Sequence, residues 1–388
     1  MYNRYLSKAI KEFLNKKIIF LTGPRQVGKT TLSKNIFLNE TAYYNYDIRK
    51  DISVFKMQEW DKDQKLVVFD EIHKMKNWKL WLKGLYDEGH LKRQAILVTG
   101  SARLNVSKKM GDSLAGRFFS YRLHPLDLKE LAKIEGLEFD LEKNYQRLIT
   151  TSNFPEPFYV GTRRFYQLWR KGHFDQIIKQ DLLTLEKIRD IDGIELLIEL
   201  LRTRVGSTIT YKSLAEDLDR DDKTVKKWIT ALENLYVGFR IQSYSKNIAR
   251  AKKKAFKFYF FDTGSVETEE GAKLENLVAL AFLKELNYLE DVHGINGELY
   301  FIQTRDGKEI DFYVQLEKKY HVLVEVKLSE TSISHSFKTI DKFFNDSHKF
   351  QIVKNSKATF ENKESVKCVN ALDFLKNLNF LNYIKIRT

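Results

Sequence analysis

The sequence predicts an α/β protein that begins with a parallel sheet carrying helices on both faces. Up to about Leu126, short apolar runs alternate with amphipathic stretches, a pattern typical of parallel α/β sheets. One apolar run, residues 17–21, leads straight into a loop with the spacing of a phosphate-binding motif, and a helix-forming stretch follows it. Only four prolines occur in 388 residues, and three of them lie where one predicted element gives way to the next.

The phosphate-binding motif, G-x4-G-K-T, lies between a predicted strand and a predicted helix, as this motif requires. Its glycines allow backbone amides to surround a phosphate, and the N-terminus of the following helix adds its positive end. Lys29 is expected to reach the β- and γ-phosphates of ATP, and the Thr30 hydroxyl is expected to ligate Mg²⁺. The residues expected to contact the nucleotide are Gly23, Pro24, Arg25, Gln26, Val27, Gly28, Lys29, Thr30 and Thr31.

A second apolar run, residues 66–69, ends in two carboxylates, Asp70 and Glu71. Ligands bind at the carboxyl ends of the strands in a parallel sheet, which places both residues beside the phosphate loop. We expect Asp70 to hold Mg²⁺ through its water shell. We expect Glu71 to polarise the water that attacks the γ-phosphate.

Two later segments contain candidates for contact with the γ-phosphate. The apolar run 95–98 ends in Thr99 and continues to Ser101, and either hydroxyl is a candidate sensor. The alternative is an ordinary turn at a strand end. Arg117, in an Ala-Gly-Arg tripeptide, is a candidate arginine finger acting within the chain or from a neighbouring subunit. A lone arginine is more often a surface charge.

Together these segments resemble the AAA+ domain of the AAA_14 family. The resemblance rests on residues 23–31, 70–73, 99–101, 115–117 and 123–131. Asn-Phe-Pro-Glu-Pro-Phe, which begins at Asn153, is similar to the Gly-Phe-Pro-Glu-Pro signature of that family, with Asn in place of the usual Gly. The C-terminal part resembles the DUF4143 domain usually fused to it. The resemblance implies a P-loop ATPase with a winged helix and a nuclease-like C-terminal domain.

A chain of this length is expected to hold about two or three domains. We divide it into a phosphate-loop domain at 1–130, a helical region at 131–203, a winged helix-turn-helix at 204–265 and a nuclease-like domain at 266–388.

The winged helix-turn-helix is indicated by helical patterns at 213–218 and 224–235, followed by strand patterns at 238–241 and 256–261. In a DNA reader, the second helix enters the major groove and the wing contacts phosphates. The candidate nucleic-acid contacts are Lys223, Lys226, Lys227, Arg250, Lys252, Lys253 and Lys254. A protein-packing role is the alternative, because three aspartates beside the second helix would repel phosphate.

The last part combines a helix near residues 272–286 with three strand-like runs. Asp311 lies in one of these runs, and Glu325 and Lys327 alternate onto one face of the next. With Glu275 on the helix, they resemble the E…D…E-x-K core of PD-(D/E)xK nucleases, which share the restriction-endonuclease fold. The resemblance implies that Asp311 and Glu325 hold Mg²⁺ while Lys327 positions or activates water. Surface pairs on a half-buried sheet are the alternative.

Composition excludes several classes of protein. No apolar run approaches the ~18 residues that span a membrane. The first residues lack the apolar core of a signal peptide, and the single cysteine, Cys368, cannot form an internal disulfide. These features predict a cytoplasmic protein without a membrane partner. The net charge of +14 favours a polyanionic partner such as nucleic acid, or reflects a biased genomic composition.

The leading hypothesis is an ATP-hydrolysing AAA+ protein that acts on nucleic acid, DNA in the first instance, through the winged helix and the nuclease-like domain. The alternative is a nucleotide-dependent switch that acts through protein partners and has an inactive nuclease-like domain. Both hypotheses require ATP and Mg²⁺, and in both a second copy of the chain is a candidate partner.

Overall fold

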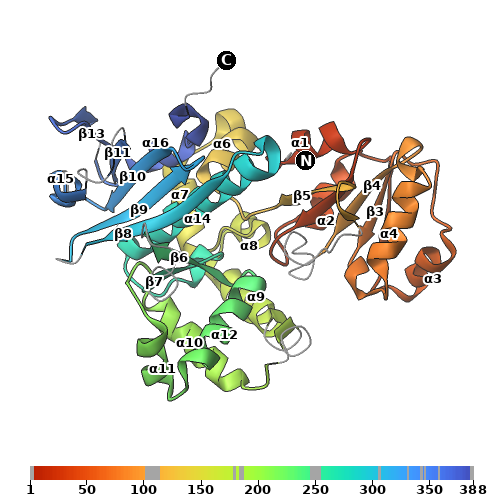
Figure 1. Ribbon diagram of the computed structural model, residues 1–388, viewed down its shortest axis with the longest axis horizontal. Coiled ribbons are helices and arrows are strands. Elements are labelled where there is room, and N and C mark those ends of the chain that lie inside the picture. Colours follow the sequence, from red (N-terminus) through yellow and green to blue (C-terminus); the bar gives the residue numbers. More distant parts are fainter. Residues whose placement is uncertain are drawn as a thin grey trace. The chain divides into compact units, whose positions relative to one another are not determined.

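The computed structural model describes residues 4–100, 114–177, 181–182, 188–244, 255–304, 307–329, 332–340, 344, 347–356 and 359–384 (Figure 1). The chain divides into two compact units. The first comprises Met1–Pro125 with Asn234–Tyr236, and the second comprises Leu126–Glu233 with Val237–Thr388. No helix in the described part of the chain is both long enough and apolar enough to cross a bilayer.

The first unit contains the predicted parallel sheet. Its five strands are β1 (Ile18–Thr22), β2 (Thr41–Asn45), β3 (Leu66–Asp70), β4 (Ala95–Thr99) and β5 (Phe118–Arg122). They pair in the order β2-β3-β4-β1-β5, and every pairing is parallel. β1, β3 and β4 are buried along their whole length, as expected for apolar runs covered on both faces.

The helices of the first unit are α1 (Ser7–Phe13), α2 (Lys29–Asn35), α3 (Arg49–Met57) and α4 (Trp78–Asp87). Alternate strand residues such as Phe20 and Phe69 form one core cluster with Phe55 of α3 and with Leu82 and Leu85 of α4. The residues between them on the strands are also buried, and α2 lies against β2, β3 and β4. This packing fixes the carboxyl ends of the strands next to the N-terminus of α2.

The second unit begins with a helical region. Its helices are α6 (Leu128–Glu135), α7 (Leu141–Thr150), α8 (Pro155–Val160), α9 (Arg163–Asp175), α10 (Ile191–Arg202), α11 (Tyr211–Leu218) and α12 (Asp222–Asn234). α11 and α12 are the two helices predicted for the helix-turn-helix. α11 begins with a capping box formed by Thr210 and Ser213. α12 begins after Asp221, whose carboxylate accepts a hydrogen bond from the Thr224 amide at 2.9 Å.

The second unit also contains a mixed eight-stranded sheet. Its strands are β6 (Gly238–Ser243), β7 (Phe256–Phe260), β8 (Gly297–Gln303), β9 (Glu309–Leu316), β10 (Tyr320–Lys327), β11 (Ser347–Val353), β12 (Phe360–Glu361) and β13 (Val366–Asn370). The order is β12-β13-β11-β10-β9-β8-β6-β7. Further helices in the described part of this unit are α14 (Glu270–His293), α15 (Ser336–Ile340) and α16 (Ala371–Lys376).

One feature of this sheet differs from the sequence-based division of the chain. The predicted wing strands, β6 and β7, belong to the same sheet as the C-terminal strands (Figure 1). The connection is a short parallel pairing in which Gln242 and Ser243 of β6 lie opposite Tyr300 and Phe301 of β8. The winged helix and the C-terminal domain therefore share one sheet.

The Asn-Phe-Pro-Glu-Pro segment connects the helical region to this sheet. The Asn153 amide donates to the Phe261 carbonyl at 2.8 Å and accepts from the Thr263 amide at 3.0 Å. The preceding Ser152 donates to the buried carboxylate of Asp262 at 2.6 Å. A glycine at position 153 could not make these side-chain bonds. The segment therefore anchors the start of α8 to the turn that follows β7.

Candidate functional site

The phosphate loop has a backbone that its glycines permit. Gly23 has φ +145°, and a Cβ added there would lie 2.2 Å from the carbonyl oxygen of Leu123. Gly28, with φ +99°, immediately precedes α2. Any side chain at Gly23 would displace the backbone that follows β5, so the loop requires glycine at that position.

Lys29 lies at the start of α2 and is 8% exposed. Its ammonium donates to the carbonyl oxygens of Gly23 at 3.0 Å and Pro24 at 2.6 Å. Both acceptors belong to the phosphate loop itself, so the positive charge is held inside the curve of the loop. The role of Lys29 in contacting phosphate stays a prediction.

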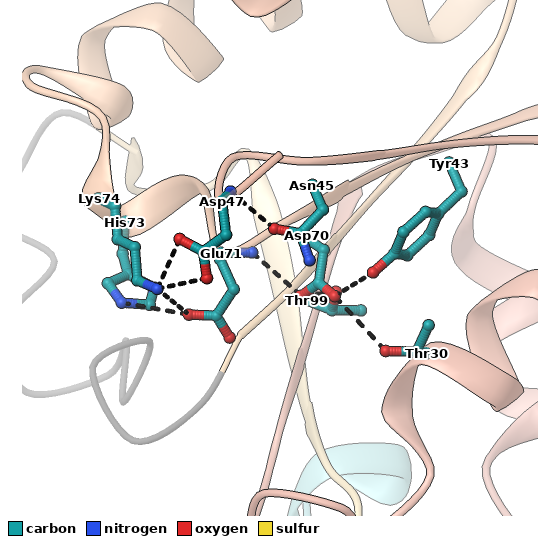
Figure 2. A network of polar contacts seen from close by, with 9 residues as sticks. All are labelled: Thr30, Tyr43, Asn45, Asp47, Asp70, Glu71, His73, Lys74 and Thr99. Carbon is teal, nitrogen blue, oxygen red and sulfur yellow. Dashed lines mark hydrogen bonds and ion pairs between the residues drawn. The ribbon is translucent and has the colours of Figure 1, made fainter. Parts of the chain in front are cut away.

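Asp70, at the end of β3, accepts hydrogen bonds from three hydroxyl groups and one amide (Figure 2). Its Oδ1 accepts from the Thr99 hydroxyl at 2.6 Å and from the Glu71 amide at 3.0 Å. Its Oδ2 accepts from the Thr30 hydroxyl at 3.4 Å and from the Tyr43 phenol. The structure thus brings together Thr30 and Asp70, the two residues predicted to hold Mg²⁺.

Tyr43 is a member of this group that the sequence did not identify. It lies on β2, and burial together with the Asp70 charge raises the pKa of its phenol well above the ordinary value. The phenol therefore stays protonated and acts as a donor. The ammonium of Lys34 lies over the Tyr43 ring, 4.1 Å from its centroid. A tyrosine two residues before the end of a strand gives no local signal of such a role.

Glu71 follows Asp70 in a left-handed backbone conformation, with φ +53°. Its Oε2 lies 3.6 Å from Nε2 of His73 and 3.7 Å from Nζ of Lys74, and accepts no hydrogen bond from the described residues (Figure 2). Burial, followed by the Asp70 charge, raises the pKa of Glu71 above its ordinary value, while nearby cations oppose the shift. A buried carboxylate with a raised pKa is typical of a general base.

Arg4 is a second contributor that the sequence did not identify. The residue is 8% exposed, and its guanidinium donates to the carbonyl oxygens of Val27 at 2.8 Å and His124 at 2.7 Å. The neighbouring Tyr5 donates to the Arg122 carbonyl at 2.6 Å. These bonds connect the phosphate loop to the segment that follows β5. An isolated arginine near the N-terminus carries no motif that would reveal this contact.

Arg117, the predicted arginine finger, lies immediately before β5. Its guanidinium pairs with Asp87 at the end of α4, with Nε–Oδ1 at 2.8 Å and Nη2–Oδ2 at 3.3 Å. The side chain therefore has a partner of its own in this structure. Ser101, one of the two sensor candidates, lies outside the described residues, whereas the other, Thr99, contacts Asp70.

In the second unit, all four residues predicted for the nuclease-like core lie close together. Asp311 of β9 accepts a hydrogen bond from the amide of Val326 of β10 at 2.9 Å. Val326 stands between Glu325 and Lys327, which form an ion pair at 2.9 Å. Burial and the Asp311 charge raise the pKa of Glu325 to about 8. Burial and the charge of nearby Asp311 also raise the pKa of Glu275 on α14, so residues of the helix and of both strands are neighbours here.

Two further residues, Lys257 and Glu309, belong to this group and were not predicted. The ammonium of Lys257, on β7, lies 3.0 Å from Glu275 Oε1, 2.6 Å from Glu309 Oε1 and 3.3 Å from Asp311 Oδ1. Burial opposes its charge, but the three carboxylates outweigh burial and raise the pKa of Lys257. We call Lys257, Glu275, Glu309 and Asp311 the Lys257 cluster.

The carboxylates of this region have cationic side chains as neighbours, and their predicted role in holding Mg²⁺ stays a prediction. Among the residues that the structure describes, no three His, Cys, Asp or Glu side chains are placed to hold one metal ion. Asp311 and Glu325, the predicted metal ligands, instead have contacts with Lys257 and Lys327 respectively.

The predicted nucleic-acid contacts are described only in part. Lys223, Lys226 and Lys227 lie exposed on α12, whereas Val225 and Trp228 of the same helix are buried. Arg250, Lys252, Lys253 and Lys254 lie outside the described residues.

Comparison with protein families gives three matches along the chain. Residues 15–132 match AAA_14, an AAA domain. Residues 142–273 match DUF8612 and residues 270–374 match DUF4143, both domains of unknown function.

Relatives span most of the chain. An uncharacterised protein of Methanocaldococcus jannaschii is 25% identical over 367 residues, covering 86% of this chain and 80% of its own length. An uncharacterised protein of Mycobacterium tuberculosis is 23% identical over 332 residues, covering 83% of this chain and 73% of its own.

Two solved structures are also similar. The Walker-type ATPase of Pyrococcus abyssi is 14% identical with a TM-score of 0.44, covering 69% of this chain and 95% of its own. The Aeropyrum pernix ORC1 protein, solved in complex with DNA, is 11% identical with a TM-score of 0.31, covering 72% and 94%. Within the chain, the match to the AAA domain family lies almost entirely in the first unit, and the matches to DUF8612 and DUF4143 lie in the second.

Proposed function

We propose that this protein binds ATP and hydrolyses it in the presence of Mg²⁺. The observation that supports this proposal is the hydrogen bond between the Thr30 hydroxyl of the phosphate loop and the Asp70 carboxylate. A hydroxyl and a carboxylate in this arrangement are the protein groups that hold Mg²⁺ beside nucleotide phosphates in P-loop proteins. Their pairing depends on two segments that are 40 residues apart in the sequence.

The other residues of the site take complementary roles. Lys29 neutralises charge on the β- and γ-phosphates, with Gly23 and Gly28 keeping the loop backbone open to them. Thr30 would ligate Mg²⁺ directly, and Asp70 would hold the ion through its water shell. When bound, Mg²⁺ supplies further positive charge to the phosphate oxygens. Glu71 accepts a proton from the attacking water, because burial and the neighbouring Asp70 charge raise the pKa of its carboxyl, as suits a general base.

The experiment compares wild type with Lys29→Ala. Removal of a charge-assisted contact is expected to weaken ATP binding about ten- to hundredfold and to abolish phosphate release. Chelation of Mg²⁺ should abolish phosphate release from wild type. Lys50→Ala, which removes an exposed lysine of α3, is the matched control. Equal affinity and turnover in Lys29→Ala and wild type would disprove the proposal.

ATP hydrolysis is proposed to act on nucleic acid. The exposed lysines of α12 support nucleic acid as the ligand, because a basic helix surface attracts phosphate. A second candidate function is a nucleotide-dependent switch acting through a protein partner. The Lys257 cluster favours it, because Lys257 pairs with carboxylates of the predicted nuclease-like core. Cleavage assays on DNA and RNA with Mg²⁺ or Mn²⁺, with and without ATP, separate a nuclease from a switch.

A further inference from the structure

The position of Lys257 carries an inference that does not depend on ATP hydrolysis. Lys257 is 1% exposed, and its ammonium lies within 3.3 Å of oxygens from Glu275, Glu309 and Asp311. These carboxylates come from α14 and β9, whereas the lysine comes from β7. A buried ammonium surrounded by carboxylates occupies the electrostatic position that a divalent cation has in a metal-dependent nuclease.

Glu275 and Asp311, two of the four residues of the predicted nuclease-like core, already have hydrogen-bond partners within this chain, whereas Glu325 Oε2 accepts no hydrogen bond from the described residues. Glu275 Oε1 accepts from the Tyr259 phenol at 2.7 Å in addition to Lys257. Asp311 offers Oδ1 to Lys257 and Oδ2 to the Val326 amide. A divalent cation would have to displace these donors. It would also lie within a few ångströms of a buried positive charge, which repels it strongly in a region of low dielectric.

The backbone before α11 lies against the same carboxylates. A Cβ added at Gly206, where φ is +78°, would lie 2.6 Å from Glu275 Oε2. Thr208 donates to Glu309 Oε2 at 3.4 Å. The side chains of Glu275 and Asp311 are 17% and 15% exposed. A scissile phosphate has to approach its metal directly, and these contacts leave little of either carboxylate open to it.

The residue next to Glu275 shows how α14 is attached here. The Asn276 side chain accepts from the Phe260 amide at 2.7 Å and donates to the Phe260 carbonyl at 3.0 Å. It therefore pairs with the backbone of β7, the strand at one edge of the sheet. Glu275 and Asn276 together fasten α14 to β7, one through Lys257 and Tyr259 and the other through the backbone.

We propose that Lys257 is a built-in cation that replaces the divalent metal, and that the Lys257 cluster is a structural centre joining β7, α14 and β9. The second unit consequently has no metal-dependent cleavage centre at Glu275, Asp311, Glu325 and Lys327. Lys257, which is not part of the E…D…E-x-K pattern, is the residue that conflicts with the expected Mg²⁺ role.

The test converts the proposed centre into a metal site. Lys257→Met keeps the length of the side chain and removes its charge. Without nucleotide, its melting temperature is expected to fall by about 10 °C, because three buried carboxylates lose their counter-charge. Mn²⁺ should then raise the melting temperature of Lys257→Met by several degrees more than that of wild type. Adding Asp311→Asn to Lys257→Met should remove this response.

Direct Mn²⁺ binding, measured by electron paramagnetic resonance on nucleotide-free protein, gives the second readout. Wild type and Asp311→Asn should bind equal amounts of Mn²⁺, and wild type should cleave no nucleic acid. If Lys257→Met does not fold, Lys257→Met/Glu309→Gln reduces the excess negative charge and undergoes the same measurements. A wild-type Mn²⁺ site that Asp311→Asn abolishes would overturn the proposal. So would a Lys257→Met protein with unchanged stability and no Mn²⁺ response.

Discussion

Tyr43 and Thr30 contact the same oxygen of Asp70, Oδ2, from two different elements of the first unit. Tyr43 belongs to β2, which pairs directly with the strand that Asp70 ends, whereas Thr30 belongs to the phosphate loop and α2. The phenol therefore orients the carboxylate through a rigid pair of strands. The Thr30 hydroxyl connects the phosphate loop to the same carboxylate.

Replacement of Tyr43 tests this orientation. Tyr43→Phe should raise the Mg²⁺ concentration needed for half-maximal ATP hydrolysis on the order of tenfold, since a hydrogen bond to a charged group contributes about 1.5–3 kcal/mol. Phosphate release at saturating ATP, measured against Mg²⁺ concentration, provides the readout. Tyr44→Phe on the same strand is the control. Superimposable Mg²⁺ titrations for the two variants would show that Tyr43 does not position Asp70.

Glu71→Gln should bind ATP normally and hydrolyse it about 10²- to 10⁴-fold more slowly, the range attributed to a general base. The substitution keeps the size of the side chain and removes its capacity to accept a proton. Single-turnover hydrolysis separates the chemical step from binding and release. Glu59→Gln, on an exposed glutamate of the same unit, serves as the control. Hydrolysis at the wild-type rate in Glu71→Gln would assign the base to another group.

Arg117 must leave Asp87 to act as an arginine finger. Arg117→Ala should then lower kcat more than ATP affinity, because a finger stabilises charge in the transition state. Asp87→Asn weakens the competing pair and should leave kcat at or above that of wild type. If Arg117 serves a neighbouring subunit, mixing Arg117→Ala with Lys29→Ala should recover part of the activity. Wild-type kcat in Arg117→Ala would mean that the pair with Asp87 is its only role.

The exposed lysines of α12 should bind nucleic acid weakly and with little sequence preference. Changing Lys223, Lys226 and Lys227 to Glu should weaken binding on every sequence. It should also reduce the dependence of log K on log salt by about three units if each lysine contacts a phosphate. A triple change of Lys318, Lys319 and Lys363, exposed residues of the same unit, alters the charge equally. Equal losses of nucleic-acid affinity in the two triple variants would mean that net charge alone, and not the surface of α12, determines binding.

The parts of the protein that could be predicted are those with a local pattern. The apolar runs predict β1, β3 and β4, and the spacing of the loop motif identifies Lys29 and Thr30. Asp70 could be placed beside them, because strands of a parallel sheet end at the same edge.

The residues that could not be predicted depend on contacts between distant segments. Arg4 reaches His124 across 120 positions of sequence, and Lys257 reaches Asp311 across 54. A lysine among the aromatic residues of β7 has the pattern of a solvent-facing position in an alternating strand. Its burial follows from α14 and the loop at Gly206, and neither is specified by residues near Lys257.

The sheet shared by β6, β7 and β8 bears on which pieces of this protein are able to fold alone. A fragment that starts at residue 270, where the DUF4143 match begins, lacks both β6 and β7. Part of β8 then becomes an open edge with unpaired backbone groups, a template for association between molecules. The same cut leaves Glu275 and Asp311 without their ammonium. The two family regions are distinct in sequence but lie in one compact unit with a shared sheet, and the second is expected to aggregate when it is separated from the first.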